Sequence, residues 1–346
     1  MDRFFLLIMV LFVFGCAESL DRNLIKVEEM VFLPIESDLG YARYSEGDIS
    51  VLPDGRLVFL FSCFKGKKDN DYGDICISFF SGAEWSLPVV FIENHAEWNV
   101  MSPSLRIVNG DYKLFYLVKN NARDCQLVFV DLDDSLNVLT EPYYLTDFGF
   151  NVVNNDRVFI DGERIIIPLS RHSELDGHII PEGDIKLLES RDAGKNWVEL
   201  DVPEPAGKIL QEPGYLEVNG VGYLYARSDQ GSQLIYDFDV RIWNESVFMS
   251  PLSPMALEES SFGLLGVFND HGGRFSYERD LRNPLVLFYG EGFSSLKYVP
   301  LELNLNGFYS YPSISELNNS IFITYTYGDY SDGGWGAIKL IKMDWL

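Results

Sequence analysis

One short pattern of hydrophobic and polar positions recurs six times along the chain. In each copy a run of apolar or alternating residues leads into a short turn, and a second apolar run follows. Asp-Gly and Asn-Gly pairs suit the type I′ hairpin turn, because both of its central residues need a positive φ. The pattern therefore predicts six β-hairpins. Four of them turn at Asp54-Gly55, Asn109-Gly110, Asp161-Gly162 and Asn219-Gly220, and two with weaker turn chemistry turn near Ser260-Ser261 and at Asn318-Asn319.

The spacing of these hairpins predicts the architecture. The turns lie roughly 40 to 60 residues apart, which is the period of a four-stranded propeller blade. Further strand-like runs lie between them, at 126–132 and 232–238 for example, and no long helical period interrupts the series. We therefore predict an all-β fold, a six-bladed β-propeller of four-stranded antiparallel blades that fills residues 22–346 as one domain. A β-sandwich or a pair of packed sheets is the alternative, and the near-regular spacing favours the propeller.

Aligning the six copies on their turns brings chemically different residues to one position. Proline follows this position in four copies, and proline is tolerated at the first residue of a strand. Equivalent strand starts surround the axis of a propeller, so the aligned residues should converge on one pocket. The residues seven positions before each turn are Gly47, Ser102, Asn154, Glu212, Ser253 and Tyr311.

The alignment places Glu212 beside Tyr311. A carboxylate can take the proton of a phenol and so make the phenol a nucleophile. We interpret the two residues as a candidate catalytic pair, and a tyrosine packed in the core is the alternative for Tyr311. Glu212 lies between Gln211 and Pro213, which is an unusual setting for a core residue.

Further polar residues cluster at or near the strand starts. Side chains of Asn and Asp that converge there can bind sugar hydroxyls, whereas capping of loop backbone is the alternative for them. A histidine at 172 could donate to a substrate oxygen or have a structural role. The candidate substrate-binding residues of this group are Asn99, Asn154, Asn155, Asp156, Arg157 and His172.

The net charge narrows the range of partners. The chain carries 52 acidic and 27 basic residues, which gives a formal charge of -25. Such a field repels phosphate backbones, so nucleic acid is not an expected partner. It also repels anionic substrates at long range, so an anionic ligand would need a local arginine cluster.

The N-terminus has the pattern of an export signal. Arg3 precedes the apolar run 4–15, which is too short to span a bilayer, and Cys16 follows Gly15 directly. This resembles the bacterial lipoprotein signal, so we predict a signal peptide over 1–16, a lipid on Cys16, and an exported protein that is anchored to a membrane. A cleaved signal with an incidental cysteine is the alternative.

The remaining cysteines do not indicate a disulfide framework. Cys63, Cys76 and Cys125 are an odd number; Cys63 and Cys76 could pair across a loop or stay as two buried thiols. No C-x-x-C or H-E-x-x-H spacing is present, and the four histidines are scattered. We therefore predict neither a metal site nor a cofactor.

One motif connects the sequence with a known family. "SRDAGKNW" at 190–197 matches S-x-D-x-G-x-x-W, the Asp-box turn of sialidase-type propellers. Together with "QEPGYLEVNGVGYLYARSDQGSQ" at 211–233, "RNPL" at 282–285 and "YSYPSI" at 309–314, it makes the chain similar to the sialidase superfamily. The resemblance covers most of the chain after the signal. It implies an exo-acting, retaining glycoside hydrolase that removes a terminal sialic-acid-like or other acidic sugar from a glycan.

The resemblance also assigns roles. It implies that Tyr311 is the nucleophile with Glu212 as its base, an exception to the two-carboxylate rule of glycosidases. Arg227 and Arg282 match the second and third arginines that hold the sugar carboxylate. Asp71 resembles the general acid on a mobile loop, and a solvated acidic loop is the alternative for it.

The first arginine departs from the family pattern. The chain reads "ARYSEGDISVL", so Arg43 lies a few residues early, and Glu46 and Asp48 lie where an arginine motif would be expected. Two acidic residues there would suit hydroxyls, an amine or a cation better than a carboxylate. Two other functions therefore stay open: a non-catalytic glycan-binding lipoprotein, and a hydrolase or lyase for another sugar that uses Glu46 and Asp48.

Overall fold

The computed structural model describes residues 23–33, 40–80, 84–175, 178–205, 207–261, 263–293, 295–332 and 334–345. These residues form β-strands and one short 3₁₀ turn, η1 (Tyr330–Asp332). The predicted signal over 1–16 and its lipidated Cys16 lie outside them. Among the described residues, there is no helix with the length and apolarity needed to span a bilayer.

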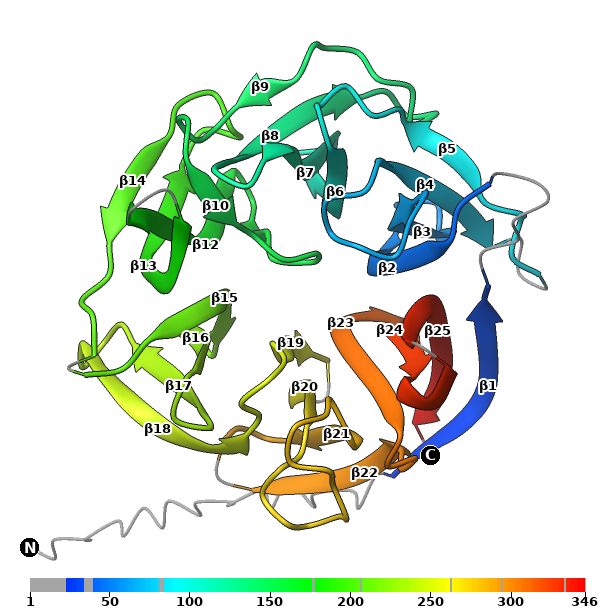
Figure 1. The fold of residues 1–346 in the computed structure, drawn as a ribbon, viewed down its shortest axis with the longest axis vertical. Helices are drawn as coiled ribbons and strands as arrows, with labels where there is room; N and C mark the ends of the chain where they lie inside the picture. The colour runs from blue at the N-terminus through cyan, green and yellow to red at the C-terminus, as the bar shows by residue number, and fades with distance from the viewer. Residues whose placement is uncertain are drawn as a thin grey trace, which may run out of the picture.

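The strands form antiparallel sheets arranged around a common centre, consistent with a propeller (Figure 1). Three sheets have four strands each. They are β15 (Leu210–Val218), β16 (Val221–Ser228), β17 (Ser232–Asp237) and β18 (Ile242–Met249); β19 (Ala256–Ser260), β20 (Gly263–Asn269), β21 (Leu285–Gly290) and β22 (Leu296–Glu302); and β23 (Gly307–Leu317), β24 (Ser320–Asp329), β25 (Gly334–Trp345) and β1 (Leu24–Phe32).

The other strands belong to one larger sheet with three antiparallel groups. Single parallel residue pairs, Gly73 with Asn99 and Cys125 with Phe150, link these groups. The groups are β2 (Arg43–Val51), β3 (Leu57–Phe64), β4 (Gly73–Phe80) and β5 (Val89–Ile92); β6 (Asn99–Val108), β7 (Asp111–Asn121), β8 (Asp124–Leu132) and β9 (Tyr143–Tyr144); and β10 (Phe150–Val152), β11 (Phe159–Asp161), β12 (Arg164–Leu175), β13 (His178–Ser190) and β14 (Val198–Asp201).

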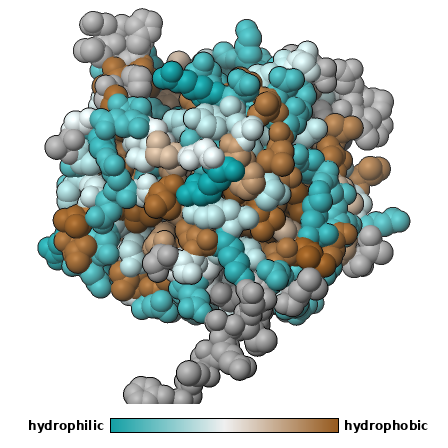
Figure 2. Space-filling view, turned by 90° about the horizontal axis from the view of Figure 1, so that it is seen from below, coloured by the Kyte–Doolittle hydropathy of each residue, from teal (hydrophilic) through white to brown (hydrophobic). Residues whose placement is uncertain are grey.

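The hydrophobic core lies between the faces of neighbouring sheets. One cluster, for example, joins Ile166 and Leu187 of one sheet to Leu210 and Leu224 of the next. Strands in the middle of a sheet are covered on both faces, so β3 is a continuous run of apolar residues with one serine, all buried. The outermost strands are exposed, as in β18, and the outer side of the molecule mixes hydrophilic and hydrophobic residues (Figure 2).

Most of the predicted hairpins form, with differences in register. Asn109-Gly110 and Asn219-Gly220 are two-residue loops in which both residues have positive φ, as a type I′ turn requires. The third loop is Gly162-Glu163, one residue later than predicted. The first hairpin is not a two-residue turn, because Val51 pairs with Leu57 and leaves a five-residue loop, Leu52–Arg56.

The segment that matches the Asp-box forms a tight turn after β13. Asp192 accepts hydrogen bonds from the backbone nitrogen of Asn196 (2.9 Å) and from the hydroxyl of Ser190 (2.9 Å). The indole nitrogen of Trp197 donates to the carbonyl of Gly194 (2.9 Å), and its ring contacts Phe129. The turn therefore covers the core of an adjacent strand group.

The structure settles the pairing of the cysteines. Cys63 of β3 and Cys76 of β4 form a disulfide, with their Cα atoms 6.2 Å apart. Cys125 is free and buried in β8. The buried disulfide links two strands that are already neighbours in the sheet.

Candidate functional site

Four inner strands are bulged at the same place, near their N-terminal ends. The pairing register shifts at Glu46 in β2, Ser102 in β6, Glu212 in β15 and Tyr311 in β23. These four residues have φ values of 53°, 55°, 52° and 55°, respectively. Positive φ is uncommon for residues other than glycine, and such bulges re-aim side chains and occur next to functional sites. The bulges therefore mark one end of the ring as the candidate site.

The alignment of the sequence found three of these four positions. Ser102, Glu212 and Tyr311 are the residues that it selected, whereas in the first copy it selected Gly47 and the structure has Glu46. Two differences combine here: Asp54 is the third residue of a five-residue loop, and the bulge of β2 leaves one residue out of the pairing whereas those of β6, β15 and β23 leave out two. In the third and fifth copies, no equivalent register shift occurs at Asn154 or Ser253.

Tyr311 lies against an arginine. The guanidinium carbon of Arg282 is 5.3 Å from the centre of the Tyr311 ring, and Arg282 also donates to the hydroxyl of Ser310. Burial raises the pKa of Tyr311 to about 12; Arg282 opposes this shift, and the negative charge of Glu212 adds to it. The phenol is therefore neutral at neutral pH, and the positive charge of Arg282 favours its ionised form.

Glu212 is paired with the second arginine of the site. Its Oε2 is 2.7 Å from Nε of Arg227, and Arg227 also donates to the side-chain oxygen of Gln211. The side chains of the ion pair keep a small exposed fraction, although the two paired atoms are themselves buried. One region of the protein thus contains the two arginines, the carboxylate of Glu212 and the phenol of Tyr311.

Arg43 reaches the same region from the start of β2. Its side chain is almost fully buried, its guanidinium carbon lies 3.9 Å from the centre of the Phe64 ring, and its Nη1 is 2.7 Å from Oδ1 of Asp69. Asp69 lies on the loop between β3 and β4, and its carboxylate adds to the rise in the pKa of both Tyr311 and Glu46. The early register of Arg43 therefore does not keep it from the site.

The loop that carries Asp69 also carries Asp71, the residue that the resemblance assigned as general acid. The carboxylate of Asp71 accepts a hydrogen bond from the backbone nitrogen of Lys68 (2.8 Å) in its own loop. The amide of Asn99 donates to the carbonyls of both Asp69 and Asp71, at 3.0 Å each. Asn99 thus holds the loop backbone, Asp69 faces Arg43, and Asp71 turns back on its loop. The sequence offered no signal that would choose Asp69, because the loop is charged throughout.

Glu46 is a buried carboxyl within the site. It accepts a hydrogen bond from the hydroxyl of Ser102 (2.7 Å) and is 6% exposed. Burial raises the pKa of Glu46 to about 7; the hydrogen bond from Ser102 and the charge of Arg43 oppose this shift, and the charge of Asp69 adds to it. At neutral pH this carboxyl is therefore only partly ionised.

Replacing Glu46 by Gln should change how stability depends on pH. Because the folded state raises the pKa of Glu46, it favours the protonated form, and this contribution is lost as pH rises from about 4.5 to about 7. We expect the free energy of unfolding of the wild type to fall over this range relative to that of Glu46→Gln, by roughly 1–3 kcal/mol. Urea unfolding at pH 4.5 and pH 8 measures this difference. The exposed Glu28→Gln is the control, and a wild type with the same pH dependence as Glu46→Gln would contradict the prediction.

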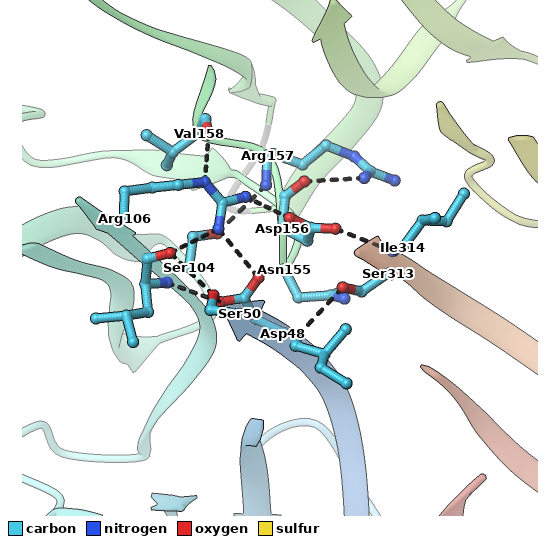
Figure 3. Close-up of polar contacts among 12 residues, drawn as sticks. Asp48, Ser50, Ser104, Arg106, Asn155, Asp156, Arg157, Val158, Ser313 and Ile314 are labelled. Carbon is cyan, nitrogen blue, oxygen red and sulfur yellow. Dashed lines mark hydrogen bonds and ion pairs between the residues drawn. The ribbon is translucent and has the colours of Figure 1, made fainter. Parts of the chain in front are cut away.

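Asp48 and Asp156, both predicted as substrate-binding, instead hold an arginine inside the ring (Figure 3). Asp48 is fully buried and accepts from the backbone nitrogen of Leu105 (2.8 Å) and from Nη1 of Arg106 (3.1 Å). Asp156 is also bonded to Arg106 and accepts from the backbone nitrogen of Ile314 (3.3 Å). We call Asp48, Arg106 and Asp156 the axial ion cluster. The sequence analysis did not select Arg106, although a charged residue among the apolar residues at the end of β6 could have indicated a buried ion pair.

The other predicted binding residues also make contacts within the protein. Asn155 donates to the carbonyls of Gly47 (2.6 Å) and Tyr311 (3.2 Å), so it ties the bulged strands β2 and β23 together. Arg157 donates to the carbonyl of Met255 (2.7 Å). The ring of His172 is within hydrogen-bond distance of the hydroxyl of Ser170 and the carbonyl of Ile180, and burial lowers its pKa. The amide nitrogen of Asn154 is buried, with no partner in the described part of the chain.

The arrangement supports a definite chemistry. Guanidinium groups pair with carboxylates in a bidentate manner, so Arg43, Arg227 and Arg282 could hold an acidic ligand despite the negative net charge of the chain. A phenol next to a carboxylate can act as a nucleophile. Within the described residues, His, Cys, Asp and Glu form no group of three that could hold a metal ion.

Comparison with solved structures gives low sequence identity and a shared fold. A protein of unknown function from Dyadobacter fermentans has a TM-score of 0.74 and 14% identity, and the match covers 93% of this chain and 99% of that one. Trypanosoma rangeli sialidase in complex with sialic acid has a TM-score of 0.67 and 13% identity, with 94% of this chain and 59% of the sialidase covered. A leech intramolecular trans-sialidase has a TM-score of 0.66 and 10% identity, with 93% and 70% covered.

These matches show a sialidase-like fold. The chain spans only 59% of the length of the Trypanosoma rangeli sialidase that it matches. No family model matches the sequence, and no curated protein does. Identities of 10 to 14% carry no conclusion about activity.

Proposed function

We propose that this protein is an exo-acting, retaining glycoside hydrolase that removes a terminal sialic-acid-like or other acidic sugar from glycans. The observation that carries the proposal is the convergence of Tyr311, Glu212 and two partly exposed arginines at bulges of equivalent strands. The sialidase-like fold supports it. The test is release of a free acidic sugar from a mixed pool of sialylated glycans.

In the proposed reaction the sugar carboxylate binds to Arg43, Arg227 and Arg282. A neutral phenol suits the nucleophile, because a carboxylate nucleophile would be repelled by the carboxylate of the substrate. Glu212 takes the phenol proton as Tyr311 attacks the anomeric carbon, and the ion pair of Glu212 with Arg227 keeps the base in place. The glycosidic bond breaks, and its oxygen leaves with a proton from a general acid. Water then attacks the anomeric carbon and gives its proton to the general acid, which now acts as base; the Tyr311 oxygen leaves and takes its proton back from Glu212. The two displacements together retain the configuration.

We propose Asp69 as the general acid, because its carboxyl group reaches the site and its side chain is 56% exposed, whereas the carboxylate of Asp71 is bonded to its own loop. Asp69→Asn should lower kcat for natural glycans by roughly 10²- to 10⁴-fold. Aryl glycosides should lose far less, because a phenolate leaves without protonation. Asp71→Asn should change both rates only slightly. If Asp71→Asn instead showed a large loss of kcat for natural glycans while Asp69→Asn stayed active, Asp71 would be the general acid.

We also propose a count of six blades for the ring. Support comes from the two single-pair parallel bridges, which divide the larger sheet into three antiparallel groups beside the three four-stranded sheets. Attachment to a membrane through a lipid on Cys16 stays part of the proposal, and mass spectrometry of the mature N-terminus tests it.

A non-catalytic glycan-binding protein is the second candidate. The observation in its favour is that Glu212 is paired with Arg227 and Asp69 with Arg43, so both carboxylates that the proposed mechanism uses already have a cationic partner. Such a protein would bind an acidic glycan with no turnover, and Tyr311→Phe would leave its affinity unchanged.

A further inference from the structure

The arginines and carboxyl groups around Tyr311 are only partly paired with one another. Arg43 pairs with Asp69, and Arg227 pairs with Glu212, with an N–O distance of 2.7 Å in both ion pairs. Each of these pairs is close to neutral, so it adds little net charge to the site. One further arginine and one further carboxyl group belong to the same region, and their partners decide which ligand the site fits.

The further arginine is Arg282, and the further carboxyl group is that of Glu46. Within the described ranges, neither of them forms an ion pair. Arg282 donates to the hydroxyl of Ser310 and lies over the ring of Tyr311, so both of its contacts are with uncharged groups. A buried charge without a partner of opposite sign is costly. A ligand that supplies both missing partners would therefore be favoured.

One oxygen of the Glu46 carboxyl group is free to bind a ligand. Its Oε2 accepts a hydrogen bond from the hydroxyl of Ser102 (2.7 Å), which fixes the side chain. Its Oε1 bonds to no described residue and is not enclosed by protein, although the residue as a whole is only 6% exposed. A carboxylate oxygen is a hydrogen-bond acceptor, so Oε1 calls for a donor on the ligand.

The backbone places Glu46 next to Tyr311. Glu46 is the bulged residue of β2, and Tyr311 lies at the equivalent bulge of β23. The amide of Asn155 donates to the carbonyls of Gly47 (2.6 Å) and Tyr311 (3.2 Å), so a single side chain holds the two bulges together. The charge of Glu46 accordingly contributes to the rise in the pKa of Tyr311. The free oxygen therefore belongs to the proposed glycosidase site.

A ligand whose only charge is a carboxylate would not balance this site. Its carboxylate would pair with Arg282, and Glu46 would then lie unpaired near a second negative charge. Burial raises the pKa of Glu46 to about 7, and the bond from Ser102 and the charges of Arg43 and Lys119 oppose this rise only in part. A hydroxyl group could bond to Oε1 but would leave its charge without a partner. An ammonium group supplies both the hydrogen bond and the charge.

We propose that the site selects acidic sugars that carry a free amino group, with the sugar carboxylate at Arg282 and the ammonium group at Oε1 of Glu46. This inference rests on the proposed function, which assigns the arginines to the carboxylate of the substrate. It narrows the substrate class from acidic sugars in general to zwitterionic ones. An N-acylated sugar has no charge on its nitrogen and would leave Glu46 unpaired.

Binding to the full chain with Tyr311→Phe separates recognition from turnover, because this variant lacks the proposed nucleophile. The probes are the methyl α-glycoside of neuraminic acid, which has a free amino group, and its N-acetyl derivative, which has the same carboxylate without the positive charge. Isothermal titration in 150 mM salt, about physiological ionic strength, at pH 8 keeps Glu46 largely ionised. We expect the amino probe to bind at least about tenfold more tightly, as for a hydrogen bond between charged groups.

Glu46→Gln in the same background should affect the two probes in opposite directions. The amino probe should lose at least about tenfold in affinity, whereas the N-acetyl probe should bind equally or more tightly, because a negative charge near its carboxylate is removed. A purely structural role of Glu46 would weaken both. Arg282→Gln should weaken both probes, since both carry the carboxylate. Glu28→Gln, on the exposed outer strand β1, is the matched control and should change neither affinity.

Three results would overturn the inference: no binding of the amino probe, equal binding of the two probes, or a Glu46→Gln variant that weakens both alike. None of them bears on the proposed function, which is tested by release of an acidic sugar by the wild type. An active wild type that does not prefer the amino probe would keep the glycosidase and reject the zwitterionic substrate. Selective binding of the amino probe without turnover would keep the recognition and reject the hydrolase.

Discussion

Tyr311→Phe should abolish turnover of glycans and leave the fold intact. The variant loses only the phenolic oxygen, which the proposed mechanism uses as nucleophile, and removal of a nucleophile costs on the order of a thousandfold or more in kcat. The ring can stay in place, because its aromatic face still contacts Arg282 when the phenolic oxygen is lost. Release of free sialic acid from a sialylated glycan pool measures the activity, and thermal unfolding checks the fold.

Tyr309→Phe is the matched control for this experiment. Tyr309 lies on the same strand two residues earlier, and it is buried in a hydrophobic cluster instead of facing the arginines. Its variant should retain turnover close to that of the wild type. An active Tyr311→Phe would rule out the tyrosine mechanism, whereas glycan binding without release in the wild type would favour the binding protein.

Arg106→Leu should destabilise the fold by about 3–5 kcal/mol, because it leaves a buried charge without its partner. Asp48 is completely buried, and Arg106 is its cationic partner as well as that of Asp156. Arg106 also donates to the carbonyls of Val158 (2.6 Å) and Leu105 (2.7 Å), which would lose these bonds (Figure 3). Urea unfolding at pH 7 measures the change.

An exposed arginine provides the comparison for this effect. Arg56 pairs with Asp54 on the first hairpin loop, and both side chains are about half exposed. Arg56→Leu should therefore cost less than about 1 kcal/mol. The double variant Asp48→Asn with Arg106→Leu should recover part of the lost stability, since it removes one of the stranded charges. A loss in Arg106→Leu no larger than that in Arg56→Leu would show that the axial ion cluster does not stabilise the fold.

Sequence reasoning succeeded where local turn chemistry decides the structure. Asn109-Gly110 and Asn219-Gly220 form the expected turns because glycine and asparagine tolerate positive φ. Asp54-Gly55 has the same chemistry, yet Val51 and Leu57 are its closing pair, and the longer loop together with the one-residue bulge of β2 moved the first aligned residue by one. Such a choice of loop length depends on the strands that flank it, which no dipeptide reveals.

The site was predictable in part for the same reason. Counting back from short turns found Ser102, Glu212 and Tyr311, since bulges keep a fixed distance from a turn of fixed length. Asp69 could not be chosen over Asp71, because the loop conformation depends on the amide of Asn99, which comes from another strand group. The structural role of Asp48 and Asp156 could not be predicted either. Both bind Arg106, which is about 50 residues away from each of them in the sequence.

The pairing of β1 with β25 has a consequence for the biogenesis of the protein. Leu24 pairs with Trp345, so the sheet that contains β1 is complete only after the last strand, β25, has been synthesised. During translation the emerging chain therefore carries an unpaired strand edge and the apolar face of its future neighbours until synthesis has reached β25. Non-local pairing of this kind is slow and exposes the chain to aggregation. Chaperones that shield incomplete chains should consequently matter more for this protein than for one whose sheets each close within a single stretch of sequence.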